Sequence, residues 1–362
     1  MNMKFKKLLL KILKIKSITG KPNGNERVLS ISMEFLKGFH FRKFVNKETP
    51  SLLFYNNFPK SKKFKIILNA HLDVVPGNKN QFVPKVVGDR LYARGAYDMK
   101  SSAIVMMSVF KDIAKKVNYP LALQLVTDEE IGGFNGTKYQ IDKGIGADFV
   151  ISGESTNFQV NNEAKGIIWI KVSYEGKTAH GARPWEGDNA IQKINRFVDR
   201  MNKLFPVANK PVWRTTQNLA KIETANTTIN KVPGDCSALF DIRYVSSDKN
   251  EVLNKIRKIM LPNMNLEVIM DEPSQFTSSN NYFINKLSKS IQKNLAKSVE
   301  LVSYHGGSDV RHYDRVGISG VCFGPLGGGL HSESEWISVK SLQLYYNTLG
   351  DFLLSLNTLR EE

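Results

Sequence analysis

The chain has 362 residues, which is more than one average domain and fits two. Hydrophobic residues make up 41% of it and aromatic residues 10%, so it can form a sizeable core. It contains no apolar run of about eighteen residues, so we expect no membrane-spanning helix and no membrane partner. The formal net charge is +17, but the lysines are spread along the whole chain without interleaved aromatic residues. This distribution predicts a solvated surface and no nucleic-acid partner.

The first sixteen residues contain a lysine-rich apolar segment that is similar to a signal peptide at first glance. Lys11 and Lys14 interrupt the apolar run, and no small-residue cleavage site follows it. We therefore expect an amphipathic helix that belongs to the domain. The two cysteines, Cys236 and Cys322, are too few for a disulfide framework and stand in apolar patterns. They predict buried thiols and a cytoplasmic location.

Strands and helices alternate in the first half of the chain. Short apolar runs predict buried strands, and one longer segment has apolar residues at helical spacing. Strands that alternate with helices indicate an α/β domain with a mostly parallel sheet flanked by helices. The predicted strands are 64–69, 121–127 and 149–152, and the predicted helix is 101–115.

The pattern changes near Lys165. From there to residue 273 the predicted order is β-α-β-β-α-β, which is the ferredoxin-like arrangement. Polar segments precede and follow this stretch, so we expect residues 165–273 to form a small α+β domain inserted between 1–164 and 274–362, the two parts of the larger domain. The expected strands are 167–174, 219–224, 238–244 and 266–270, and the expected helices are 189–204 and 250–260.

Side chains that commonly bind metals follow the predicted strands of the larger domain. In an open α/β sheet, ligands collect at the carboxyl ends of the strands, so we expect these side chains to converge. Taken singly, each has an ordinary alternative: a His-x-Asp pair is often only hydrogen-bonded, and three successive acids often start a helix. Imidazoles and carboxylates without cysteine suit zinc, cobalt or manganese. The residues are His71, Asp73, Asp98, the run 128–130, Glu154 and His331.

Five motifs stand in order along the chain: AHLDVVPG, LYARGAYDMKSS, TDEEIGG, SGEST and GPLGGGLHSESEW. They give the chain a specific resemblance to the M20 metallopeptidase family, and the resemblance spans nearly its whole length. That family includes acetylornithine deacetylase, succinyl-diaminopimelate desuccinylase, aminoacylases and glutamate carboxypeptidase. The resemblance implies a zinc-peptidase-like catalytic domain with an inserted dimerisation, or lid, domain. Ala93, Ser101 and Ser155 depart from common family residues without removing a ligand.

The resemblance implies a role for each metal-type side chain. Asp98 would bridge two divalent metal ions, most readily Zn²⁺, with cobalt or manganese as alternatives. His71 and Glu154 would complete one site. Glu130 and His331 would complete the other.

Two further residues receive roles from the same resemblance. Glu129 would be the general base, and Asp73 would hydrogen-bond His71 and fix its tautomer. Glu154 is a glutamate where aminopeptidases and dipeptidases of the family often carry aspartate. This difference favours a deacylase or a carboxypeptidase.

The inserted domain and the loop after it contain the expected substrate-binding residues. His180 resembles the family histidine that reaches the active site of the partner subunit in a homodimer, although a surface turn is its ordinary alternative. Asn230 and Arg243 resemble binders of the substrate carboxylate, for which the arginine fork is well shaped; a solvated strand position is the alternative for Arg243. The last group resembles a loop whose backbone approaches the substrate: Gly306, Gly307 and Ser308.

The sequence thus predicts a two-metal hydrolase that cleaves an amide bond of an N-acyl amino acid or a small peptide with a free carboxylate. An aminopeptidase or dipeptidase of the same family, a non-catalytic binding descendant and a nucleic-acid binder are the alternatives.

Overall fold

The computed structural model describes residues 3–357, which divide into two compact units. The smaller unit comprises Ala164–Gln275 and Ser303–Gly307, and the rest of residues 3–357 forms the larger unit. The expected insertion, 165–273, lacks the short segment 303–307, which the sequence places in the larger domain. The backbone N–H of Lys165 donates to the carbonyl of Tyr304 at 3.2 Å, which attaches this segment to the smaller unit.

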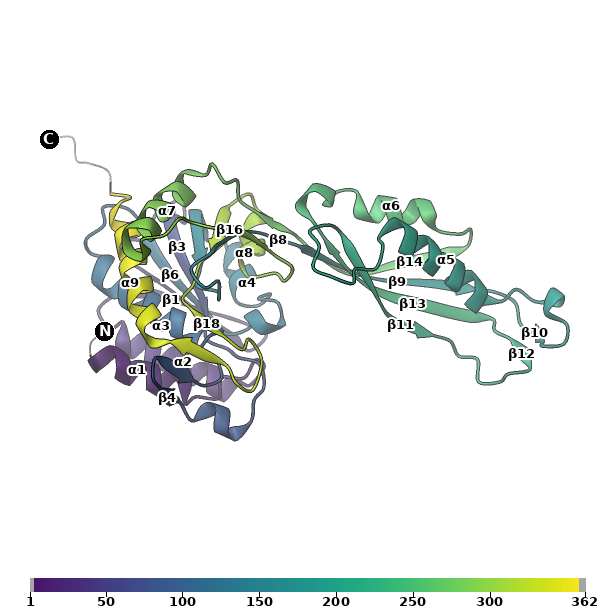
Figure 1. Cartoon of the computed structure of the whole chain (residues 1–362), viewed down its shortest axis with the longest axis horizontal. Helices are drawn as coiled ribbons and strands as arrows, with labels where there is room; N and C mark the ends of the chain where they lie inside the picture. The colour runs from purple at the N-terminus through teal and green to yellow at the C-terminus, as the bar shows by residue number, and fades with distance from the viewer. Residues whose placement is uncertain (1–2, 358–362) are drawn as a thin grey trace. The chain divides into compact units, whose positions relative to one another are not determined.

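The core of the larger unit is a mixed nine-stranded sheet within residues 3–357 (Figure 1). Its central strands run parallel in the order β6-β3-β7-β17, as expected from their apolar runs, and antiparallel strands extend it on both sides. The strands are β1 (His40–Asn46), β2 (Thr49–Tyr55), β3 (Lys63–His71), β6 (Leu121–Val126), β7 (Gly146–Ser152), β8 (Val160–Ala164), β15 (Gln275–Phe276), β16 (Leu301–Tyr304) and β17 (Ser319–Cys322).

Helices cover both faces of this sheet. One face packs against α1, α2, α3, α7 and α9, and the other packs against Ile141 of α4 and Tyr313 of α8. Ser338 caps α9 by accepting a hydrogen bond from the Ser341 backbone N–H. The predicted first helix is confirmed as α1, whose buried residues join the main core. The helices are α1 (Met3–Leu13), α2 (Pro22–Phe35), α3 (Lys100–Ile113), α4 (Thr137–Asp142), α7 (Tyr282–Leu295), α8 (Val310–Asp314) and α9 (Val339–Leu354).

A second, four-stranded antiparallel sheet lies in the larger unit, with the order β18-β19-β5-β4. The turn between β18 and β19 contains His331. No helix in the described part of the chain is long and apolar enough to cross a membrane. The strands are β4 (Lys85–Val87), β5 (Arg90–Tyr92), β18 (Gly327–Gly328) and β19 (Trp336–Ser338).

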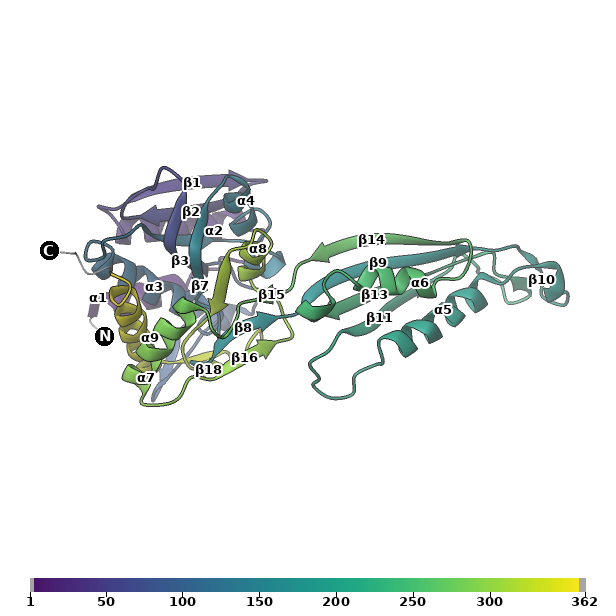
Figure 2. The same ribbon diagram turned by 90° about the horizontal axis from the view of Figure 1, so that it is seen from above.

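The smaller unit has the predicted ferredoxin-like order. Its four antiparallel strands are arranged β11-β13-β9-β14, and α5 and α6 lie on one face of the sheet (Figure 2). Asn189 caps α5 by accepting from the Gln192 backbone N–H. The elements are β9 (Gly166–Glu175), β10 (Ala179–His180), α5 (Ala190–Leu204), β11 (Thr216–Glu223), β12 (Lys231–Val232), β13 (Asp235–Tyr244), α6 (Val252–Ile259) and β14 (Met264–Glu272).

Candidate metal centre

Five side chains expected to bind metal come together in the larger unit. His71 is the last residue of β3, and Glu154 follows the end of β7. Glu130 lies in the short 3-10 helix η2 (Glu129–Ile131) that follows β6. Asp98 precedes α3, and His331 comes from the turn of the smaller sheet. The carboxyl ends of three adjacent strands therefore supply three of the five ligands, as the sequence predicted.

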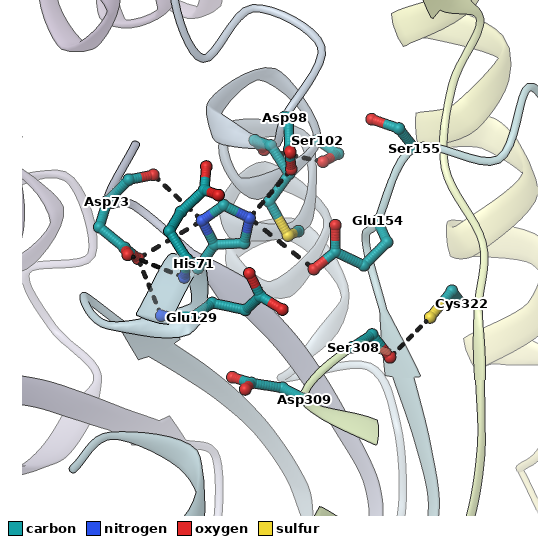
Figure 3. A network of polar contacts seen from close by, with 12 residues as sticks. His71, Asp73, Asp98, Ser102, Glu129, Glu154, Ser155, Ser308, Asp309 and Cys322 are labelled. Atoms are coloured by element: carbon teal, nitrogen blue, oxygen red, sulfur yellow. Dashed lines mark hydrogen bonds and ion pairs between the residues drawn. The ribbon is translucent and has the colours of Figure 1, made fainter. Parts of the chain in front are cut away.

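The five side chains form two overlapping groups that share Asp98. In each group, the candidate ligand atoms lie within 4.8 Å of one another. His71 Nε2 lies 3.1 Å from Asp98 Oδ1 and 3.7 Å from Glu154 Oε1 (Figure 3). His331 Nε2 lies 3.1 Å from Asp98 Oδ2 and 3.1 Å from Glu130 Oε2. One carboxylate thus offers a separate oxygen to each group, which is the arrangement that a bridging ligand needs.

The charges around these ligands are unbalanced without cations. Burial opposes the imidazolium form of His71, but Glu154, Asp73 and Asp98 together raise its pKa well above the usual value. Glu154 Oε1 is buried and has no hydrogen-bond partner among the described residues. Such an oxygen is costly unless a cation faces it.

The pKa values of the acids show the same crowding. Burial, followed by the charge of Asp98, raises the pKa of Glu130 to about 7. Burial also raises the pKa of Glu154 well above its usual range. For Asp98, the hydrogen bonds from the two histidines outweigh burial and lower the pKa. Two divalent cations would neutralise these carboxylates, so the residues present fit a two-metal centre.

Asp73 holds the imidazole of His71 from the other side. His71 Nδ1 lies 3.0 Å from the backbone carbonyl of Asp73 and 3.4 Å from its carboxylate Oδ1. Both partners accept a hydrogen bond, so the proton belongs on Nδ1 and the lone pair on Nε2. The sequence predicted that Asp73 hydrogen-bonds His71 and fixes this tautomer. Of the two Asp73 acceptors, the backbone carbonyl lies closer to Nδ1 than the carboxylate does.

Glu129 belongs to neither ligand group, although its neighbour Glu130 does. Its carboxyl group lies beside His71 and Glu154 (Figure 3). Burial and the negative charge of Glu154 raise its pKa well above the usual range. A half-buried carboxylate whose proton affinity is raised can accept a proton and return it.

Residues 67–355 match the sequence profile of peptidase family M20/M25/M40. The chain belongs to this family. A curated relative in family M20, the succinyl-diaminopimelate desuccinylase of Buchnera aphidicola, is 26% identical over 376 aligned positions, with 95% of this chain and 97% of the relative covered.

Two solved structures show the same fold. An aminopeptidase from Bacillus cereus superposes with a TM-score of 0.80 at 17% identity, with 97% of both chains covered. A dinuclear metal-binding peptidase from Bacillus subtilis superposes with a TM-score of 0.73 at 11% identity, covering 98% of this chain and 97% of that one. The predicted M20 membership, two-part α/β fold and hydrolase class are therefore confirmed.

A buried ion pair of this M20 chain supports the loop that carries Asp98. Arg94 Nη1 lies 2.7 Å from Glu335 Oε2, and both side chains are almost fully buried. Glu335 also accepts hydrogen bonds from three backbone N–H groups of the loop that ends at Asp98. Arg94 Nη2 donates to the carbonyl of His331, whose φ of 57° lies in the left-handed region. The pair thus fixes the backbone of two metal-type ligands.

Arg94→Met is expected to lower the free energy of unfolding by about 3 kcal/mol, because it leaves the Glu335 carboxylate buried without its cation. Arg90→Met is the matched control, since Arg90 is exposed and stacks on Trp336. We expect the control to cost at most about 1 kcal/mol. Urea unfolding of both metal-free variants measures the difference, and equal losses would contradict it.

The turn after Glu130 is held by helix α8. Arg311 Nη2 and His312 Nε2 donate to the Gly132 carbonyl at 2.6 and 2.8 Å. A Cβ on Gly133, whose φ is 65°, would lie 1.9 Å from Asp309 Oδ1, so only glycine fits this contact. Helix α8 therefore fixes the backbone that follows the expected catalytic glutamate.

His312 makes stability depend on pH. Burial and the nearby Arg311 lower its pKa from 6.5 to about 3. Between those values the unfolded chain binds more protons, so the contribution of His312 is full above pH 6.5 and is lost as pH falls toward 3. The substitution His312→Gln keeps a hydrogen-bond donor for the Gly132 carbonyl but removes the titrating group. We expect it to reduce the change of the unfolding free energy with pH by up to about 1.4 kcal/mol per pH unit. Denaturant titrations from pH 4.5 to 7 test this, and equal slopes would refute it.

In the smaller unit, strand pairing brings together two of the predicted substrate-binding residues. His180 pairs with Lys231 across β10 and β12, and the N–H of Gly181 donates to the Asn230 carbonyl at 2.7 Å. The Ala182 backbone N–H donates to His180 Nδ1 at 3.1 Å, which leaves the ring proton on Nε2. Exposed His180 can therefore donate a hydrogen bond outward from Nε2.

The other residues predicted to bind substrate lie in both units, and two of them already make polar contacts within the chain. Arg243 is half-buried on β13 and forms a two-point ion pair with Asp241, at 2.8 and 3.1 Å. Gly306 lies in the smaller unit with open space where a Cβ would be. Ser308 belongs to the larger unit, and its hydroxyl accepts from the Val310 N–H and the Cys322 thiol. Cys236 and Cys322 are buried and unpaired with each other, as predicted.

Proposed function

We propose that the chain is a two-metal hydrolase that cleaves the amide bond of an N-acyl amino acid or a small peptide with a free carboxylate. The observation that carries this proposal is Asp98, which offers one oxygen to each of two ligand groups beside the half-buried Glu129. Zn²⁺ is the proposed ion, with Co²⁺ or Mn²⁺ as alternatives, because the donors are imidazoles and carboxylates without thiolates.

Each site has its own terminal ligands in this proposal. His71 and Glu154 hold one cation, and Glu130 and His331 hold the other. When bound, the two cations supply Lewis acidity, which polarises a carbonyl and acidifies a water molecule. Asp73 keeps the proton of His71 on Nδ1, so that Nε2 faces the cation.

Glu129 is the proposed general base. It accepts a proton from the attacking water and then delivers it to the nitrogen of the leaving amine. Its raised pKa matches this double task, because the carboxyl group must hold the proton between the two steps. The oxyanion that forms on the scissile carbonyl needs a further hydrogen-bond donor.

We propose that the smaller unit supplies that donor and the substrate contacts, and that it is the dimerisation, or lid, domain. His180 donates from Nε2 to the oxyanion in the site of the partner subunit. Asn230 and Arg243 bind the substrate carboxylate, which would compete with Asp241 for the arginine fork. The backbone of 306–308 would lie along the substrate. A homodimer follows from this role of His180, and a cytoplasmic location follows from the two cysteines; both stay predictions.

A hydrolysis screen tests the proposal. The purified chain, loaded in turn with Zn²⁺, Co²⁺ and Mn²⁺, is offered N-acetyl, N-succinyl and N-formyl amino acids, dipeptides and tripeptides. We expect hydrolysis of acylated amino acids or of peptides through their free carboxyl end. Cleavage only of peptides with a free amino end would instead support an aminopeptidase or dipeptidase. Two bound metals without turnover on any compound would support a non-catalytic binding protein.

Mixing two inactive variants tests the proposed role of His180. A hybrid dimer of His180→Ala and Glu129→Gln has one site with both an intact base and an intact histidine. If subunits exchange at random, half of the dimers are hybrids, so about one quarter of the parent activity should return. No recovery, with exchange verified by mass spectrometry, would rule out a histidine that acts across the dimer.

A further inference from the structure

The segment Ile15–Thr19, between α1 and α2, is bound along the loop that follows His71. We call these five residues the N-terminal strap. The Ser17 hydroxyl donates to the Leu72 carbonyl at 2.6 Å, and the Ser17 carbonyl accepts from the Val74 N–H at 2.9 Å. The N–H of Thr19 donates to the Val74 carbonyl at 3.2 Å. These bonds alternate along the strap and along residues 72–74. The strap therefore fixes the backbone on either side of Asp73.

The strap has a second anchor at the start of helix α3. Lys100 lies in the first turn of α3, two residues after Asp98, and is fully buried. Its Nζ donates to the Ile15 carbonyl at 2.8 Å. One short segment is therefore tied to the loops that carry two of the proposed metal ligands, His71 and Asp98.

Thr19 ends the strap with a contact to a carboxylate. Its hydroxyl donates to Asp73 Oδ2 at 2.8 Å. The backbone N–H groups of Glu129 and Glu130 also point at this carboxylate, but at 3.4 and 3.3 Å. Asp73 is completely buried, so its orientation depends on these few donors. The Thr19 hydroxyl is the closest of the three.

The two oxygens of Asp73 have different tasks. Oδ2 accepts from Thr19, and Oδ1 lies 3.4 Å from His71 Nδ1. A hydrogen bond at one oxygen sets the rotation of the carboxyl group and so aims the other oxygen at the imidazole. Because the contact with His71 is long, a small rotation is enough to remove it.

We propose that Thr19 is a positioning residue for the metal centre. It orients Asp73, which in turn holds His71 with Nε2 toward the first cation and supports the backbone of the Glu129–Glu130 turn. The inference rests on the proposed two-metal function and adds a hydroxyl from a segment with no metal ligand of its own. Thr19 acts through Asp73 and touches neither cation nor substrate.

Two substitutions separate the hydroxyl from the shape of the side chain. Thr19→Val keeps the branched shape and removes the donor, and Thr19→Ser keeps the donor. Co²⁺ binding to the metal-free full-length chain is followed by its visible absorbance, in competition with a chelator. Groups that orient a metal ligand change affinity by roughly 10- to 100-fold. Thr19 is one contact further from the metal, so we expect about three- to tenfold weaker Co²⁺ binding at one of the two sites in Thr19→Val. Thr19→Ser should bind Co²⁺ with the affinity of the parent.

Every result of this titration decides the matter. Parent affinity at both sites in Thr19→Val overturns the inference, and so does an equal loss in the valine and serine variants, because that would indicate a packing defect. A loss in Thr19→Val alone supports it, whether at the site of His71 only or at both sites, because Asp73 also accepts from the Glu130 N–H. If the parent binds two Co²⁺ ions and the valine variant shows the loss, yet no compound is hydrolysed, the proposed function fails and the positioning role stands. If the parent binds no metal, both fail.

Discussion

Glu129→Gln is expected to lower kcat by about 1,000-fold while both metal ions remain bound. General acid–base catalysis contributes roughly 10²- to 10⁴-fold, and glutamine has the shape of glutamate without its ability to accept a proton. Glu129 is in neither ligand group, so the metal content should not change. KM should stay within a few-fold of the parent value, because the lost interaction belongs to the transition state.

Steady-state kinetics and metal analysis on the same preparation check this expectation. Glu34→Gln is a suitable control, since Glu34 is exposed and its ion pair with Lys11, at 3.6 Å, is also exposed. The control should leave kcat unchanged. A Glu129→Gln variant within tenfold of the parent would mean that another group accepts the proton. Loss of metal from it would mean that Glu129 is a ligand.

The parts of the site that the sequence predicted are those encoded locally. Strands β3 and β6 are nearly continuous apolar runs that end at polar residues, so their burial and their carboxyl ends can be read from the pattern. His71 is the last residue of β3, and Glu130 lies four residues after the end of β6. Their convergence then follows from the geometry of a parallel sheet, without knowledge of any particular contact.

The roles of Arg94 and Thr19 were beyond the reach of the sequence, because each role depends on one long-range contact. Arg94 and Glu335 are 241 positions apart, and Thr19 and Asp73 are 54 positions apart. A single arginine or threonine has no periodicity, and its ordinary interpretation is a solvated surface residue. Only the packing of the loops shows that Arg94 is buried with its charge paired.

The antiparallel flanks of the large sheet were missed for a related reason. The β1–β2 hairpin reverses at Lys47 and Glu48, both with positive φ, where the sequence offers neither glycine nor asparagine as a turn signal. The place of the segment 303–307 in the smaller unit was missed because no local sequence signal marks it. Its attachment to the smaller unit rests on contacts such as the ring pair of Trp213 and His305, which are 5.7 Å apart.

Asp98→Asn is expected to abolish binding of both metal ions and to lower kcat/KM by about four orders of magnitude. Each of the other four ligands serves one group, whereas Asp98 serves both. The amide has only one oxygen and no charge, so it cannot face two cations at once. The Lewis acidity of two cations is worth several kcal/mol at the transition state, and each ~1.36 kcal/mol is tenfold in rate.

Metal stoichiometry distinguishes the bridge from an ordinary ligand. His331→Ala should retain about one metal ion per chain, because the group of His71 and Glu154 stays intact, and Asp98→Asn should retain none. Asp112→Asn, an exposed position on the same helix, α3, is the control and should retain two. If Asp98→Asn keeps one ion while His331→Ala keeps none, the shared ligand is not Asp98. The two cations would then be held by separate carboxylates, and the single water between them that Glu129 serves would have no common position.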